Sequence, residues 1–256
     1  MTEEEAIIRL RAAGCVFAED EAAVLTEAAA EAAAPEDHLA ALVARRVAGE
    51  PLEQVVGYAD FAGVRVRLRP GVFVPRVRSE LLVQVAADEA GRHPDPLVVD
   101  LCCGSGALGL AVRHRVRVTL HAADLDPVAV ACARDNLGGN VYQGDLFDAL
   151  PPELEGRITV LLANVPYVAT RHLPFLPAEA RDHEPATALD GGEDGLAVFR
   201  SVLGRTKSWL APGGLLLSEI TDAQVEAAIA AVDGNGLTAA VITDDDLDAR
   251  VITARR

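Results

Sequence analysis

The chain has 256 residues, with 39 acidic and 23 basic side chains and a formal net charge of −16. This length suits one full α/β domain with a smaller appendage, and a composition that is half hydrophobic but only 4% aromatic favours helices on a buried sheet over a β-sandwich. A surface this acidic repels a phosphate backbone, so nucleic acid is not expected as a direct substrate.

Residues 1–56 are predicted to form a small N-terminal helical domain. The apolar residues of its best-defined helix recur on one helical face: Leu39, Leu42, Val43 and Val47. Pro35 suits the first turn of that helix and Gly49 suits its C-terminal exit. Two further helices are expected before it, and the expected role of this domain is structural.

Residues 57–78 are predicted to be a β-hairpin that connects two domains. Apolar residues alternate with arginines from Val64 to Arg69, which is typical of a strand with one buried face. A helix is predicted to begin at Ser79, because Ser79 and Glu80 are residue types that favour a helix N-terminus.

The remaining residues, 79–256, alternate apolar strands with helical segments. Strands are expected at 97–101, 116–126, 158–164 and 213–220, with a further short strand between the second and third of these, just before Asp145. This alternation predicts an α/β fold with a doubly wound, mainly parallel sheet. The tail from Leu237 to Thr253 is expected to add a hairpin at the edge of that sheet.

A glycine-rich segment, CCGSGALGL, follows the strand at 97–101. Gly104, Gly106 and Gly109 satisfy G-x-G-x-x-G where a strand turns into a helix, and such glycines let the backbone approach a ligand closely. Asp124 ends the next strand twenty residues after Gly104, where it can accept hydrogen bonds from two ribose hydroxyls. The pattern predicts an adenosine-containing cofactor, and by itself it also fits a dinucleotide.

Three further acidic or amide residues favour S-adenosylmethionine. Asp100 comes directly before the glycine loop, where it would repel a pyrophosphate but could hold an ammonium group. Asp145 follows a predicted third short strand and could accept from an adenine amino group, with Leu146 and Phe147 beside the ring. Asn164 ends the fourth strand at the same carboxyl edge of the sheet.

The segment LLANVPYVAT, residues 161–170, predicts a clamp for a planar amide, although a strand that runs into a turn would also explain it. The side-chain oxygen of Asn164 and the carbonyl of Val165 could each accept one N–H of a primary amide. Pro166 stiffens the turn, and Tyr167 can stack on the amide and lie beside a sulfonium cation.

Seven segments, taken in order, resemble the bacterial protein-(glutamine-N5) methyltransferases of the release-factor type from about residue 49 to the end. These segments are GEPLEQVVGYADFAGVRVRLRPGVFVPR, VVDLCCGSGALGL, ADLDPVAVACARDN, GDLFDAL, NVPYV, HEPATALDGGEDGL and LAPGGLLLSEI. The resemblance implies a class I, Rossmann-like S-adenosylmethionine-dependent methyltransferase sheet behind a helical N-terminal domain. It also implies a glutamine amide in a protein as the acceptor, with a release factor as the first candidate, and S-adenosyl-L-homocysteine as a product.

The resemblance and the residue patterns together define the expected site. The catalytic clamp is Asn164, Val165, Pro166 and Tyr167. The expected cofactor contacts are Asp100, Cys102, Cys103, Gly104, Ser105, Gly106, Asp124, Leu125, Asp145, Leu146, Phe147 and Asn164. The expected substrate contacts are Arg76, Arg78, Glu80, Asn164 and Tyr167.

Three positions depart from the family pattern. Val165 replaces a proline, but its expected role belongs to the backbone carbonyl, which valine also has. Arg78 replaces an acid in the segment PRVRSE, a charge reversal near the expected substrate entrance. Cys102 and Cys103 stand where glycine and threonine are usual, which changes the packing of the cofactor loop.

Other functions remain open on the sequence alone. The acceptor could instead be a small-molecule amide or a nucleobase amine, or the chain could bind the cofactor without catalysis. A dinucleotide oxidoreductase fits less well, because no residue set for hydride transfer is evident. His183 and Glu184 could suggest acid–base chemistry, but a structural role is the simpler interpretation.

The cysteines and the N-terminal residues predict a cytoplasmic protein. The four cysteines show no CxxC pair and no zinc-site spacing, so reduced thiols and no metal site are expected. The segment MTEEEAIIRL is acidic where a secretory signal would be basic, and no apolar run reaches the length of a membrane span.

Overall fold

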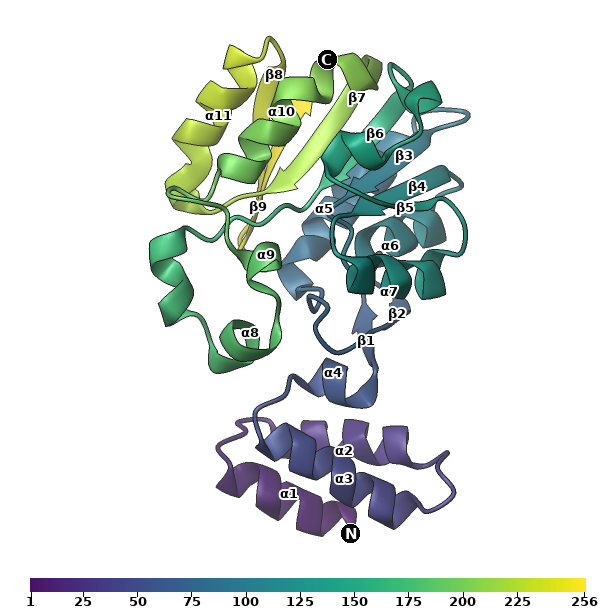
Figure 1. The fold of residues 1–256 in the computed structure, drawn as a ribbon, viewed down its shortest axis with the longest axis vertical. Coiled ribbons are helices and arrows are strands. Elements are labelled where there is room, and N and C mark those ends of the chain that lie inside the picture. Colours follow the sequence, from purple (N-terminus) through teal and green to yellow (C-terminus); the bar gives the residue numbers. More distant parts are fainter.

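The computed structural model describes residues 1–256, which form a helical N-terminal unit and a larger α/β unit joined by a two-stranded hairpin (Figure 1). The N-terminal unit contains α1 (Glu3–Ala12), α2 (Ala18–Ala29), α3 (Pro35–Val47) and α4 (Leu52–Val56). These four helices share a hydrophobic core of their own, which includes Leu10, Leu25, Leu42, Val43 and Val55.

The predicted helix of the N-terminal unit is confirmed, with one correction to its apolar face. Pro35 occupies the first turn of α3, and Gly49 follows the helix with a left-handed φ of 98°. Leu39, Leu42 and Val43 are buried as expected, but Val47 is 44% exposed. Val47 lies in the last turn, where the helix has already moved away from the shared core.

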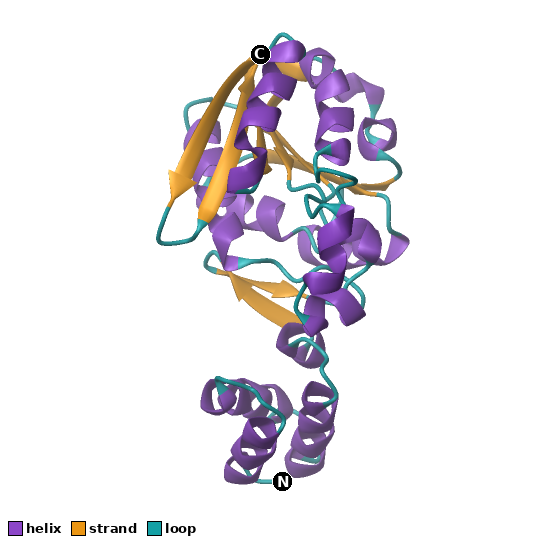
Figure 2. Cartoon of the chain, turned by 90° about the vertical axis from the view of Figure 1, so that its left-hand side faces the viewer, coloured by secondary structure: helices purple, strands orange, loops and turns teal.

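The connecting hairpin consists of β1 (Tyr58–Phe61) and β2 (Val64–Arg67) and lies between the two units in Figure 2. Its two turn residues, Ala62 and Gly63, both have positive φ, which matches the right-handed twist of the flanking strands. Val66 is fully buried, whereas Arg65 and Arg67 face solvent. The alternation in the sequence therefore predicts the buried side of β2 correctly.

The α/β unit is built on a seven-stranded sheet in the order β5-β4-β3-β6-β7-β9-β8. Its strands are β3 (Leu97–Leu101), β4 (Thr119–Asp124), β5 (Val141–Gln143), β6 (Ile158–Ala163), β7 (Leu210–Glu219), β8 (Thr238–Asp244) and β9 (Ala249–Arg255). The first five are parallel, and β9 runs antiparallel to both of its neighbours. The predicted parallel sheet and C-terminal edge hairpin are both confirmed.

Helices cover both faces of the sheet. One face packs on α5 (Glu80–Ala90), α6 (Ala107–Arg115) and α7 (Pro127–Leu137), and the other on α10 (Ala197–Trp209) and α11 (Val225–Gly234). Successive residues of β6 alternate between the two cores, with Val160 and Leu162 on one side and Leu161 and Ala163 on the other. Burial on both faces explains why the central strands are continuously apolar rather than alternating.

The strand order places a binding crevice between β3 and β6. The chain proceeds from β3 outward to β4 and β5, then returns to β6 on the other side of β3. At such a reversal the loops after neighbouring strands leave on opposite faces, which opens a crevice at the carboxyl ends.

None of the helices combines the length and apolar character that a bilayer crossing requires.

Short helical segments lie in the connections between the main elements. They are η1 (Val77–Ser79) before α5, η2 (Leu146–Ala149) and η3 (Pro152–Leu154) after β5, and η4 (Thr170–Phe175), α8 (Ala178–His183) and α9 (Ala186–Leu189) after β6. A further turn, η5 (Asp222–Gln224), follows β7.

Candidate active site

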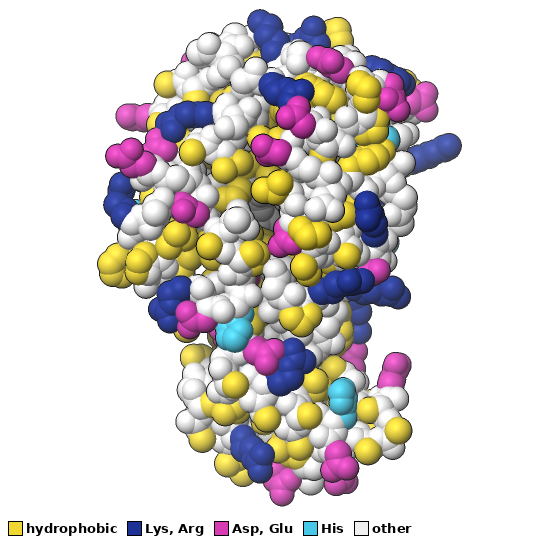
Figure 3. All heavy atoms as spheres, viewed as in Figure 1, with side chains coloured by type: hydrophobic (Ala, Val, Ile, Leu, Met, Phe, Trp, Pro, Cys, Tyr) yellow, Lys and Arg dark blue, Asp and Glu magenta, His cyan; other side chains and the backbone are white.

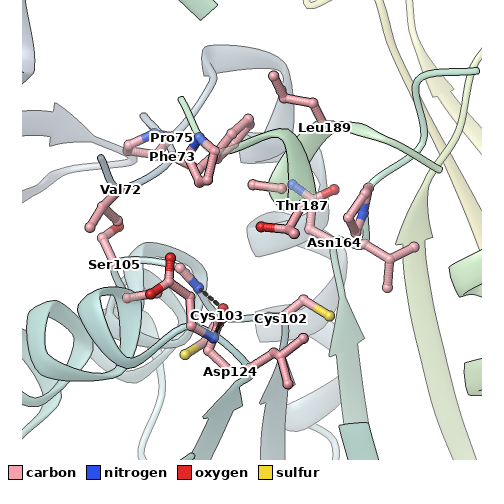
Figure 4. Close-up of a pocket in the computed structure, with 18 of the residues that line it drawn as sticks. Val72, Phe73, Pro75, Cys102, Cys103, Ser105, Asp124, Asn164, Thr187 and Leu189 are labelled. Atoms are coloured by element: carbon pink, nitrogen blue, oxygen red, sulfur yellow. Dashed lines mark hydrogen bonds between the residues drawn. The ribbon is translucent and has the colours of Figure 1, made fainter. Parts of the chain in front are cut away.

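A cavity of about 740 Å³ lies at the carboxyl ends of β3, β4 and β6. Its mouth is the hollow near the centre of Figure 3, bordered mostly by hydrophobic side chains. In Figure 4, Cys102, Cys103 and Asp124 lie at the strand ends, Phe73 and Pro75 lie across the cavity, and Asn164 and Thr187 close one side. A volume of this size is in the range of sites that hold a nucleoside-sized ligand.

The glycine loop after β3 leaves the backbone open toward the cavity. Cys102 and Gly104 have φ angles of 54° and 56°, and a side chain at Gly104 would meet no atom within 4 Å. Gly106 has a different role, because a Cβ there would lie 2.8 Å from Leu137 of α7. Gly104 therefore provides approach to a ligand, and Gly106 lets α6 and α7 pack closely.

Asp124 and the loop residues Cys102, Cys103 and Ser105 line the cavity, as do Leu125, Asp145 and Leu146. The Asp124 carboxylate accepts hydrogen bonds from the backbone N–H groups of Gly104 at 2.8 Å and Asp126 at 2.9 Å. Burial raises the pKa of Asp124. Two carboxylate oxygens offer about four acceptor positions, so this oriented group can still accept from the hydroxyls of a ribose.

Four predicted site residues lie outside the lining of the cavity. One of them is Gly106, which packs against Leu137. Asp100 is completely buried and accepts from the N–H of Gly109 at 3.0 Å, which supports a role in holding the loop rather than an ammonium group. Phe147 is 1% exposed and stacks on Trp209 with ring centroids 5.2 Å apart. Glu80 accepts from the N–H of Ala62 in the hairpin and so braces the connection between the units.

The amide of Asn164 is held in one orientation. Its Nδ2 donates to the hydroxyl of Ser79 at 3.3 Å, and its Oδ1 is buried without a hydrogen-bond partner. No hydrogen bond within the chain ends on the carbonyl oxygen of Val165, whose side chain lies in the core. Two adjacent free acceptors at a cavity wall indicate a place for a ligand with N–H donors.

Tyr167 is fixed at both its backbone and its hydroxyl. Its hydroxyl donates to Glu219 at 2.8 Å, and its carbonyl accepts from the side chain of Gln224 at 2.9 Å. Burial and the neighbouring Glu219 carboxylate raise the pKa of Tyr167. The phenol therefore stays protonated and remains a donor to Glu219, while the ring lines the cavity.

The two predicted arginines line the cavity with different partners. Both hydrogen bonds of Arg76 go to Glu184, at 2.7 Å, and Glu184 also accepts from the N–H of Val74. The buried Glu184 carboxylate, paired with the partly exposed Arg76, supports the structural interpretation of Glu184. Arg78 pairs with Glu219 at 2.8 Å and lies 5.9 Å from the centre of the Tyr167 ring.

Sequence reasoning missed two residues that contact the clamp. Ser79 was expected at the start of a helix, but its hydroxyl does not cap α5 and instead donates to Glu219 at 2.7 Å. Glu219 ends β7 next to β6, so knowledge of the strand order would have placed it at the same carboxyl edge. The linker residues Val72, Phe73 and Pro75 also line the cavity, which no motif indicated.

The doubly wound parallel sheet, the open glycine loop after β3 and the acid that ends β4 define a class I S-adenosylmethionine-dependent methyltransferase. Residues 63–178 match the Methyltransferase small domain family. The crystal structure of ribosomal protein L11 methylase from Lactobacillus delbrueckii subsp. bulgaricus has a similar fold, with a TM-score of 0.53 at 16% identity over 75% of this chain and 84% of that chain.

The particular family follows from sequence identity. The chain is 39% identical over 189 residues to the release factor glutamine methyltransferase of Streptomyces coelicolor, covering 72% of this chain and 67% of that protein. It is 36% identical over 234 residues to that of Mycolicibacterium smegmatis, covering 88% and 81%. The chain belongs to the release factor glutamine methyltransferase family.

One relative carries a different name. The 4-amino-L-phenylalanine/4-methylamino-L-phenylalanine methyltransferase of Streptomyces pristinaespiralis is 37% identical over 189 residues, which covers 69% of this chain and 63% of that protein.

Proposed function

We propose that this chain transfers the methyl group of S-adenosylmethionine to the side-chain amide nitrogen of a glutamine in a protein, and that this protein is a peptide chain release factor. The observation that carries the proposal is the pair of free acceptors, Asn164 Oδ1 and the Val165 carbonyl, beside a nucleoside-sized cavity. A primary amide offers two N–H donors on one nitrogen, which matches two adjacent acceptors.

The clamp orients the amide nitrogen of the acceptor, which is a poor nucleophile. The lone pair of an amide nitrogen is delocalised into its carbonyl, so the nitrogen attacks only when it is held in position. With both N–H groups bound by Asn164 and Val165, the lone pair points out of the amide plane. When bound, S-adenosylmethionine would supply a methyl group on a positively charged sulfur and would leave as S-adenosylhomocysteine as its S–C bond breaks and the N–C bond forms. The methylated nitrogen would then be cationic and could release a proton to water, so no general base is needed beforehand.

The remaining clamp residues limit the motion of the acceptor. Tyr167 is held by Glu219 and Gln224, so its ring presents a fixed face against which a flat amide can stack. Asp124 and the open backbone at Gly104 fit the ribose side of the donor. Asp145 and Leu146 line the neighbouring wall, where an adenine ring would lie.

The protein acceptor is proposed from the family, in which the Streptomyces coelicolor relative is named for release factors. A protein substrate also suits the position of the clamp, which lies at a cavity of the α/β unit that opens to the surface. All four cysteines are free thiols, which suits the reducing cytoplasm that we propose as the location.

The decisive experiment is labelled methyl transfer to a purified release factor from the same organism, followed by mass spectrometry of its glutamine-containing peptides. Asn164→Ala is expected to lower kcat/KM at least a hundredfold, because one N–H of the acceptor is left unbound. Asn235→Ala, which removes an amide at the far end of α11 that bonds only Ala231, is the matched control. Label on no glutamine, or equal rates in Asn164→Ala, would contradict the proposal.

A small amino acid with an amine or amide is the second candidate acceptor. The relative named for 4-amino-L-phenylalanine supports it, and the 44% exposed Arg78 side chain at the cavity could pair with a substrate carboxylate. Label in the low-molecular-weight fraction of a lysate would favour this candidate. Cofactor binding without transfer to any acceptor would indicate a non-catalytic protein.

A further inference from the structure

The carboxylate of Glu219, at the carboxyl end of β7, is contacted by three other side chains. Its side chain is 4% exposed and accepts two hydrogen bonds, from the Ser79 hydroxyl at 2.7 Å and from the Tyr167 hydroxyl at 2.8 Å. It also forms an ion pair with Arg78, whose Nε lies 2.8 Å from Oε1. Arg78 supplies the counter-charge that a buried carboxylate needs. Residues from β7, the loop after β6 and the linker before α5 therefore meet at one anion.

The direction of these hydrogen bonds determines how the Asn164 amide lies. A carboxylate can only accept, so the single hydroxyl proton of Ser79 goes to Glu219. The oxygen of Ser79 can then only accept from its other neighbour, Asn164, which lies 3.3 Å away through Nδ2. Asn164 must therefore turn its NH₂ group to Ser79, which leaves Oδ1 as the free and buried acceptor.

We infer that Glu219, acting through Ser79, is a positioning residue that sets the polarity of the Asn164 amide and so makes it an acceptor for N–H donors of the substrate. A reversed Asn164 amide would present its own N–H groups to the N–H groups of the substrate and would repel them. The same carboxylate holds Tyr167, so one residue orients both walls of the clamp. This inference rests on the proposed function, because it assumes an acceptor that offers N–H groups.

The hydrogen bonds from Asn164 to Ser79 and from Ser79 to Glu219 form a relay. The Glu219→Gln variant is expected to reverse the direction of this relay rather than merely remove it. Tyr167 donates to Oε1 and the Arg78 cation lies beside the same oxygen, so the amide oxygen of a glutamine is expected on that side. Its NH₂ group then faces Ser79, whose hydroxyl accepts from it and donates its proton to Asn164. Asn164 must flip, and its NH₂ group replaces the free acceptor at the cavity.

The kinetic test compares Ser79→Ala, Ser79→Thr and Glu219→Gln on the purified release factor. Ser79→Ala and Glu219→Gln are expected to lower kcat/KM ten- to a hundredfold, with a higher KM for the release factor. Their calorimetric Kd for S-adenosylmethionine is expected to stay within twofold of wild type. Ser79→Thr keeps the hydroxyl and is expected to keep at least half of the activity. Wild-type kinetics in Ser79→Ala, or equal losses in Ser79→Ala and Ser79→Thr, would overturn the inference.

A second measurement does not depend on which acceptor the enzyme uses. In ¹⁵N-labelled protein, the side-chain amide signals of Asn164 can be assigned by their loss in Asn164→Ala. We expect these signals to move in Ser79→Ala and Glu219→Gln and to stay in place in Ser79→Thr. Unchanged signals in Ser79→Ala would refute the relay. If wild-type protein does not methylate the release factor but the signals move as expected, the proposed acceptor is wrong and the relay stands.

Discussion

The carboxyl group of Asp100 lies wholly inside the protein, where one oxygen accepts from the N–H of Gly109 and the other has no partner. Burial raises its pKa from 3.8 to about 7. The folded chain therefore keeps a proton that the unfolded chain releases between these pH values. Its stabilising contribution is complete below pH 3.8 and is lost as the pH rises through 7.

Replacing Asp100 with asparagine should remove this pH dependence. The free energy of unfolding of Asp100→Asn, measured relative to wild type by guanidinium titration, is expected to rise by about 2 kcal/mol between pH 5 and pH 8. An asparagine has the same shape and carries no charge at either pH. A difference between the two proteins that does not vary with pH would show that Asp100 is already ionised at pH 5.

Gly195 shows how a residue far along the chain supports Tyr167. It has a φ of 79°, and a Cβ at this position would overlap the carbonyl oxygen of Tyr167 and the side chain of Gln224. Gly195→Ala should lower the free energy of unfolding by about 2 kcal/mol or more and reduce methyl transfer. Gly204→Ala is the control: it lies in α10 with no atom near its Cβ and should raise stability by about 0.5 to 1 kcal/mol. Chemical unfolding of both variants measures this contrast.

At the scale of elements, Asn136 near the end of α7 joins three segments. Its side chain accepts from the N–H of Arg67 and donates to the carbonyl of Arg67, each at 2.9 Å, so it pairs with strand β2 as a neighbouring strand would. It also donates to the carbonyl of Ser105 at 2.9 Å. One side chain thus ties the connecting hairpin to the cofactor loop.

Truncating Asn136 should weaken both connections. Asn136→Ala is expected to lower the free energy of unfolding by about 2 kcal/mol, because three hydrogen bonds of about 0.5 to 1.5 kcal/mol each are lost. It should also raise the Kd for S-adenosylmethionine, since the Ser105 backbone loses its support. Arg67→Ala tests the geometry, because Asn136 contacts only the backbone of Arg67. If Arg67→Ala proves as harmful as Asn136→Ala, the backbone contacts are not responsible.

The arrangement of elements also explains what could be predicted from the sequence. Asp124 and Asn164 come at or directly after predicted parallel strands, and the carboxyl ends of such strands meet at one edge. Phe147 could not be placed in this way, because Leu146 has a φ of 45° and the chain turns the next ring into the core. Glu219 lies 52 residues from Tyr167, and only the pairing of β6 with β7 brings them together.

At the scale of the whole molecule, Arg46 connects the N-terminal unit to the segment that follows the clamp. Its guanidinium is mostly buried and pairs with Glu21 of α2 at 2.6 Å and Glu179 of α8 at 2.7 Å. Glu179 lines the cavity. The N-terminal unit therefore holds one wall of the site, which adds to the structural role that the sequence predicts for it.

Breaking the ion pair between Arg46 and Glu179 should loosen the cavity wall that contains Glu179. Arg46→Ala and Glu179→Ala are each expected to increase proteolytic cleavage within residues 170–190 and to raise the KM for the release factor. The Arg46→Ala protein loses stability as well, because Glu21 is left buried without a partner. In a double-mutant cycle on unfolding free energy, a coupling near zero would show that Arg46 and Glu179 do not interact.

The cofactor loop places two thiols, Cys102 and Cys103, in the wall of the cavity. This cavity is proposed to hold S-adenosylmethionine, whose sulfonium group is an alkylating reagent. A thiolate there would be a far better nucleophile than an amide nitrogen and would take the methyl group itself. Burial raises the pKa of both thiols, and the surrounding carboxylates, Asp100 and Asp124 among them, raise it further. Both cysteines therefore stay protonated, and intact mass spectrometry after long incubation with S-adenosylmethionine should find the enzyme unmethylated. Burial of these thiols, reinforced by the neighbouring acids, thus protects the enzyme from being methylated by its own cofactor.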